Sequence, residues 1–174
     1  MLGGPQADVL NYTAFGRTAE DLAPEIVSMM LGNYDIVRGL AAQWDFDAVF
    51  FLQPTVWTGA KRLTPEEALL RDGASAMDGF PVGCDPDWEP ILVACYMRLE
   101  EAADSLPDMY SLVPIFDDAD ETVYIDYTGV HLTPFGNGIA AEEMARFIVN
   151  SGYLGDLLYE YNQIADTGGP PSIP

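Results

Sequence analysis

Apolar residues recur at helical spacing in the first third of the chain. Across residues 20–43 they return every three or four positions, which is typical of an amphipathic helix. Thr18 and Asp21 have the spacing of a capping box, so we expect the helix to begin there. Gly32 and Asn33 are weak helix formers inside this stretch, and they leave open whether it forms one helix or two.

Short apolar runs without helical spacing predict strands. Residues 48–52 (AVFFL) are aromatic and β-branched without alternation, which is typical of a central parallel strand that is covered on both faces. Three further runs are compatible with short strands, namely residues 8–12 (DVLNY), 111–116 (SLVPIF) and 122–126 (TVYID).

Three more helices are predicted between and after these strands. Residues 63–70 (LTPEEALL) contain a capping box formed by Thr64 and Glu67. Residues 91–106 and 138–150 have helical spacing of apolar positions.

The order of these elements predicts the fold class. Residues 72–90 are rich in Gly, Pro and Asp and predict a long loop. Strands that alternate with helices predict an α/β fold, a three-layer sandwich with a short, mostly parallel sheet. We expect one domain over residues 1–164, followed by a disordered tail at 165–174.

The charge of the chain changes which partners are expected. Seven Lys and Arg stand against 28 Asp and Glu, a net charge of −21, which disfavours nucleic acid and anionic membranes. An acidic surface whose only lysine is Lys61 suits high salt, where screening weakens self-repulsion. We find neither an apolar run long enough to span a membrane nor a signal peptide.

Metal and cofactor sites are not expected. Cys84 and Cys95 lack zinc-site spacing, and either one disulfide or two reduced thiols fits them. The acidic run at residues 117–121 (DDADE) lacks the spacing of an EF-hand and predicts a solvated loop.

The only histidine, His131, lies close to Asp126 in a short loop before the last helix. Because functional loops lie at the carboxyl ends of parallel strands, this pair fits the general base and orienting carboxylate of a hydrolase. The alternative is a hydrogen-bonded loop histidine, with Asp126 capping a turn.

Three segments carry a family resemblance. Residues 123–148 (VYIDYTGVHLTPFGNGIAAEEMARFI) resemble the final conserved block of the SGNH, or GDSL-type, hydrolases. Residues 49–67 (VFFLQPTVWTGAKRLTPEE) and 9–22 (VLNYTAFGRTAEDL) resemble two other segments of that family.

The resemblance implies an incomplete SGNH or flavodoxin-like fold and an esterase that acts on a small-molecule carboxylic ester. His131 would then be the general base, Asp126 its orienting carboxylate, and the Gly16 N–H an oxyanion-hole donor. Trp57 and Lys61 follow the strand at residues 48–52 and are therefore predicted at the rim of the substrate pocket.

The chain departs from the family pattern in ways that favour a second hypothesis. The family's Asp stands three positions before its His, where this chain has Thr128. The Gly-Asp-Ser nucleophile block and the Gly-x-Asn-Asp block are absent, so no nucleophile is assigned. A non-catalytic binding or assembly protein is the alternative. Loss of the first strand would expose a sheet edge, so we expect either a homodimer or use of residues 8–12 in a rearranged sheet.

Overall fold

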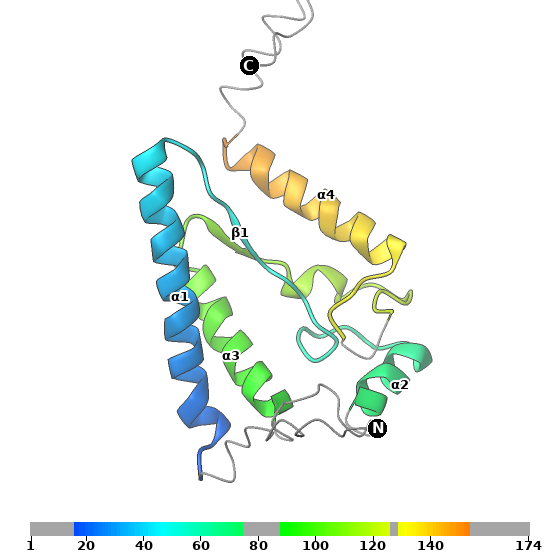
Figure 1. Cartoon of the computed structure of the whole chain (residues 1–174). Helices are drawn as coiled ribbons and strands as arrows, with labels where there is room; N and C mark the ends of the chain where they lie inside the picture. Colours follow the sequence, from blue (N-terminus) through cyan, green and yellow to red (C-terminus); the bar gives the residue numbers. More distant parts are fainter. Residues whose placement is uncertain (1–15, 75–87, 126–128, 154–174) are drawn as a thin grey trace, which may run out of the picture.

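The computed structural model of the protein describes residues 16–74, 88–125 and 129–153 (Figure 1). Most of these residues are helical. The elements in chain order are α1 (Ala19–Trp44), β1 (Phe50–Leu52), α2 (Pro65–Ala74), α3 (Trp88–Ala103), β2 (Met109–Ser111), the 3-10 helix η2 (Val113–Phe116) and α4 (Pro134–Asn150).

β1 and β2 pair in parallel, with Phe50 opposite Met109 and Leu52 opposite Ser111. Long helices combined with a parallel strand pair confirm the α/β class. Alternate side chains of β1 pack on different helices, because successive strand residues point to opposite faces. The Phe50 ring lies 4.6 Å from that of Tyr34 on α1, and the Phe51 ring lies 5.7 Å from that of Phe147 on α4.

One hydrophobic cluster joins α1 to α3, and these two helices share the most extensive contact between elements (Figure 1). Leu52 packs against this cluster, so α1 and α3 lie on the face of β1 opposite to α4. The buried members of the cluster are Ala23, Val27, Cys95 and Leu99.

Helix α1 begins as predicted and continues past the two weak positions. Thr18 accepts a hydrogen bond from the Asp21 N–H, and the Asp21 carboxylate accepts one from the Thr18 N–H. The helix is continuous through Gly32 and Asn33. One glycine costs only about 1 kcal/mol in a helix, and burial of Tyr34 just beyond it offsets that cost.

Two of the predicted strands differ from the structure. The run at residues 111–116 is a strand only at its start, because Pro114 has no N–H and favours the 3-10 turn that follows. In the run at residues 122–126, Tyr124 forms an isolated antiparallel bridge with Leu132 and does not join the parallel pair.

Several predictions fall outside the described residues. They concern the strand at 8–12, residues 75–87 of the predicted loop, the tail at 165–174, and Cys84. The two ends of that predicted loop, residues 72–74 and 88–90, are helical and belong to α2 and α3. Cys95 is a free, buried thiol, and burial raises its pKa. None of the described helices combines the length and apolar character needed to cross a membrane.

Candidate functional site

A cavity of about 600 Å³ lies beyond the carboxyl ends of both parallel strands. Phe51 and Pro54 line it from the end of β1, Leu112 from the end of β2, and Met144 from α4. This is where ligands bind in open α/β sheets, because the loops that follow the strands converge there. The cavity is therefore the candidate site.

Three polar side chains line this otherwise apolar cavity, namely Gln53, His131 and Asn137. His131 is exposed, so its ring lies in the wall and remains accessible to solvent. Few polar groups in an apolar concavity are typical of sites for small organic ligands. His131 is the only one of the three whose side chain is an imidazole, the group that most often serves as a general base.

The backbone around His131 is closed into a short loop. The Ile125 N–H donates to the His131 carbonyl at 3.1 Å, and the Thr133 N–H donates to the Val123 carbonyl at 2.7 Å. Thr133 also caps α4, accepting a hydrogen bond from the Gly136 N–H at 3.0 Å. These bonds fix both ends of the loop.

The segment after β1 holds this loop from the other side. The Val56 N–H donates to the Gly129 carbonyl at 2.8 Å, and the Gln53 side-chain amide donates to the Val130 carbonyl. Gly129 has a φ of +62°, and a Cβ there would come closer than 3.0 Å to Trp57. Only glycine fits this combination of left-handed backbone and close packing.

Trp57 is part of this support. Its ring packs edge-to-face on Trp88 with centroids 4.5 Å apart, and it covers Gly129. It also packs against the buried cluster of Val56, Phe116, Val123 and Tyr124, so its described contacts are structural. The predicted substrate role of Trp57 stays a prediction.

Lys61 lies in a buried ion pair. Its ammonium is 3.0 Å from the Glu67 carboxylate, and the two side chains are 3% and 0% exposed. Glu67 also accepts hydrogen bonds from the backbone N–H groups of Thr64, Val123 and Tyr124 at 2.7 to 3.2 Å. The described contacts of Lys61 are therefore structural. The predicted substrate role of Lys61 stays a prediction.

Burial alone would raise the pKa of Glu67. The hydrogen bonds from the Thr64 and Val123 N–H groups, together with the Lys61 ammonium, outweigh burial and lower that pKa below its ordinary value. A charged carboxylate thus ties α2 to the segment that leads into the His131 loop.

The structure does not bring all the predicted catalytic residues together. Asp126 and Thr128 lie outside the described residues, so the predicted orienting carboxylate stays a prediction. Gly16 has a φ of +71° and precedes α1. Gly16 is not among the residues that line the cavity, and its predicted role as an oxyanion donor stays a prediction.

None of the serines in the described ranges lines the cavity. Ser111 is hydrogen-bonded to Glu100 and to the Val113 N–H, and Ser105 donates to the Ala102 carbonyl. Ser75 and Ser172 fall outside those ranges.

Sequence reasoning missed Gln53 and Asn137 as site residues. Gln53 ends the predicted strand, and that position could have indicated the carboxyl edge of the sheet. Asn137 lies one turn into α4, and its side chain donates to the Leu132 carbonyl at 3.2 Å.

Comparisons with protein-family models, with curated proteins and with solved structures found no match for this chain. Within the described part of the chain, no group of three or more His, Cys, Asp or Glu is arranged to hold a metal ion.

Proposed function

We propose that the protein is an SGNH-like hydrolase of small carboxylic esters, with His131 as its general base. The observation that carries this proposal is the place of His131, in an apolar cavity beyond the carboxyl ends of two parallel strands. The proposal includes the finer fold, an incomplete three-layer SGNH-like sandwich, and is supported by helices on both faces of β1.

In the proposed reaction, the His131 imidazole takes the proton of a hydroxyl as that oxygen attacks the ester carbonyl carbon. The tetrahedral intermediate collapses, and the alkoxide leaves with the proton from the imidazolium. Water then attacks the acyl-enzyme by the same route, which releases the acid and restores the hydroxyl. Asp126 orients the imidazole in this scheme.

Two cavity side chains can assist the carbonyl oxygen. The amides of Gln53 and Asn137 each use one N–H in the hydrogen bonds to the loop. An amide nitrogen carries two hydrogens, so each retains a second N–H. A donor aimed at the developing oxyanion is worth about 3–4 kcal/mol in hydrolases where it has been removed.

Hydrolysis of a short-chain nitrophenyl ester by the full chain tests the proposal. We expect His131→Ala to lower the rate by about 100-fold or more, because general-base assistance has that size. Gln43→Ala, an exposed change on α1, is the matched control and should leave the rate unchanged. Equal background rates in all three proteins would overturn the proposal.

A fluorophosphonate probe locates the nucleophile independently. It should modify one hydroxyl in the wild-type chain and fail to modify His131→Ala, and peptide mass spectrometry would identify the residue. Absence of labelling in the wild-type chain would contradict an acyl-enzyme.

The second candidate is a non-catalytic protein that binds a small apolar ligand in the same cavity. It is favoured by the cavity wall, which contains no serine among the described residues. Amide shifts of Gln53 and Asn137 on titration with a short-chain carboxylate, without hydrolysis of the matching ester, would support it.

A further inference from the structure

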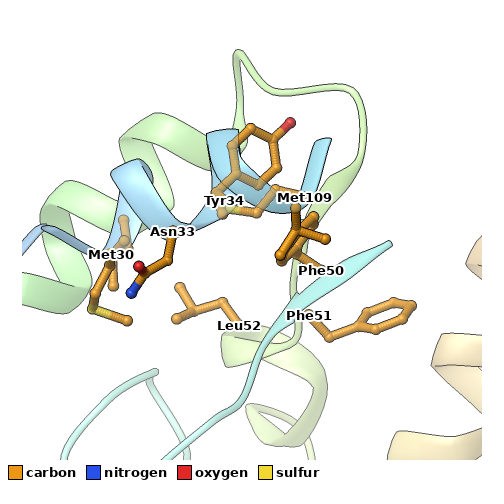
Figure 2. A pocket seen from close by; sticks show the side chains of 9 residues that line it. Met30, Asn33, Tyr34, Phe50, Phe51, Leu52 and Met109 are labelled. Atoms are coloured by element: carbon orange, nitrogen blue, oxygen red, sulfur yellow. The ribbon is translucent and has the colours of Figure 1, made fainter. Parts of the chain in front are cut away.

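A second cavity, of about 260 Å³, lies between α1 and β1 (Figure 2). Met30, Asn33 and Val37 line it from α1, and Phe50 and Leu52 line it from β1. Figure 2 shows Phe51 pointing to the other side of the strand. Leu99 of α3 and Met109 of β2 also line it, so this groove lies over the face of the strand pair that α1 covers.

A row of apolar or uncharged residues runs along α1, and three of its members line this groove. Apolar or uncharged residues follow each other at alternating steps of four and three, and several are well exposed, with Trp44 at 74%. Charged residues are absent from this row although the chain carries a net charge of −21. The row consists of Ile26, Met30, Asn33, Val37, Leu40 and Trp44.

The neighbouring edge of β1 offers backbone groups. The Phe50 N–H donates to the Asp108 carbonyl, and the Leu52 carbonyl accepts from the Leu112 N–H, so both residues bond toward β2. In a parallel strand the next residue bonds to the opposite side. The N–H and C=O of Phe51 therefore point to an edge where no strand of the described residues pairs.

We propose that residues 8–12 (DVLNY) add to this edge as a third parallel strand, covered by the uncharged row of α1. The right-handed rule for connections between parallel strands supports this position of residues 8–12 beside β1. β1 connects to β2 through α3, and a strand at 8–12 would connect to β1 through α1. Because α1 and α3 lie on one face, right-handed crossovers place the new strand on the far side of β1 from β2.

The length of the chain fits this position. Met30 to Val37 lie about 16 to 27 Å along α1 from its first residue, at 1.5 Å per residue. Residues 12 to 8, counted back from Gly16 in extended form, reach about 13 to 26 Å. Leu10 thus reaches the level of Phe51 when the chain turns back at the start of α1.

The charge and polarity of residues 8–12 also match those of the groove. Asp8 is the only charged residue in the segment at 1–15, so an almost uncharged strand meets an uncharged groove. With Leu10 beside Phe51, alternation directs Val9 and Asn11 toward α1. Asn11 then faces Asn33, a polar side chain of α1 that lines the groove.

Nuclear magnetic resonance on the isotope-labelled full chain tests the pairing, and it does not depend on any hydrolase activity. We expect cross-strand proton contacts between the Phe51 amide and residues 9–11, and slow exchange of that amide. A mixture of differently labelled chains distinguishes contacts within one chain from contacts between chains. Contacts only between chains, which a dimer through this edge would give, overturn the proposal, as does a fast-exchanging Phe51 amide.

Two matched substitutions provide a second measurement. Leu10→Asp should speed exchange of the Phe51 amide by tenfold or more, because a buried charge opposes strand addition. Leu2→Asp makes the same chemical change in the same segment but outside the proposed strand, and should leave the exchange rate unaltered. Equal effects of the two substitutions would contradict the assignment.

Discussion

At the scale of single residues, Gly129 is the clearest requirement of the candidate site. It combines a left-handed backbone with direct packing on Trp57 and Val56, next to the loop that carries His131. The loop is therefore positioned by a contact that no larger residue allows.

Gly129→Ala should destabilise the protein by about 2–5 kcal/mol, from a left-handed backbone penalty of about 1–2 kcal/mol and an overpacking term of about 1–3 kcal/mol. Gly152→Ala separates these terms, because Gly152 has a φ of +81° with no atom near its Cβ position. Urea denaturation should show the smaller loss for Gly152→Ala. An equal loss of unfolding free energy in the two variants would mean that the packing of Gly129 on Trp57 adds nothing to the cost of the substitution.

At the scale of elements, Glu67 joins α2 to the segment at residues 122–124. The carboxylate receives two backbone N–H groups of that segment and the Lys61 ammonium. Removal of one partner of a buried ion pair typically costs about 3–5 kcal/mol. Glu67→Gln should therefore lower the free energy of unfolding by that amount, whereas Glu66→Gln, at an exposed neighbour, should change it little.

The ion pair of Lys61 and Glu67 also makes the stability of the folded chain depend on pH. Because the pKa of Glu67 is lower in the folded chain, the unfolded chain binds a proton more readily. The stabilisation is therefore complete above the ordinary Glu pKa of about 4.3 and is lost as the pH falls through the folded value. Urea midpoints measured across this range should fall more steeply for wild type than for Glu67→Gln. Parallel curves would contradict the role of Glu67.

Elements that depend on neighbouring residues were predictable from the sequence, and elements that depend on distant contacts were not. The caps at Thr18 and Thr64 follow from residues three positions away, and both were predicted correctly. Pro114 could have excluded a full strand over residues 111–116. The bridge between Tyr124 and Leu132 depends on tertiary contacts, including those of Glu67, which no local pattern reveals.

The candidate site was predictable in part for the same reason. His131 stood out because it is the only histidine. The expected reason for its place, a parallel strand over residues 122–126, was wrong, since Tyr124 forms only an isolated antiparallel bridge with Leu132. The burial of Lys61 did not follow, because its partner and its environment come from folding.

At the scale of the whole molecule, charge is the dominant feature. A net charge of −21 on 174 residues destabilises the compact state through self-repulsion. Near 1 M salt the Debye length falls to about 3 Å, so most of this repulsion is screened. We expect the urea midpoint to rise with NaCl concentration at neutral pH, and to rise less at acid pH, where carboxylates are protonated. A midpoint independent of salt would contradict this prediction.

The position of Lys61 has a practical consequence for studies of assembly. The single lysine of the chain is 3% exposed and bonded to a carboxylate. Amine-reactive cross-linkers and dyes will therefore find no accessible lysine on the folded protein. Carbodiimide coupling through the abundant Asp and Glu side chains is the chemistry that suits this surface.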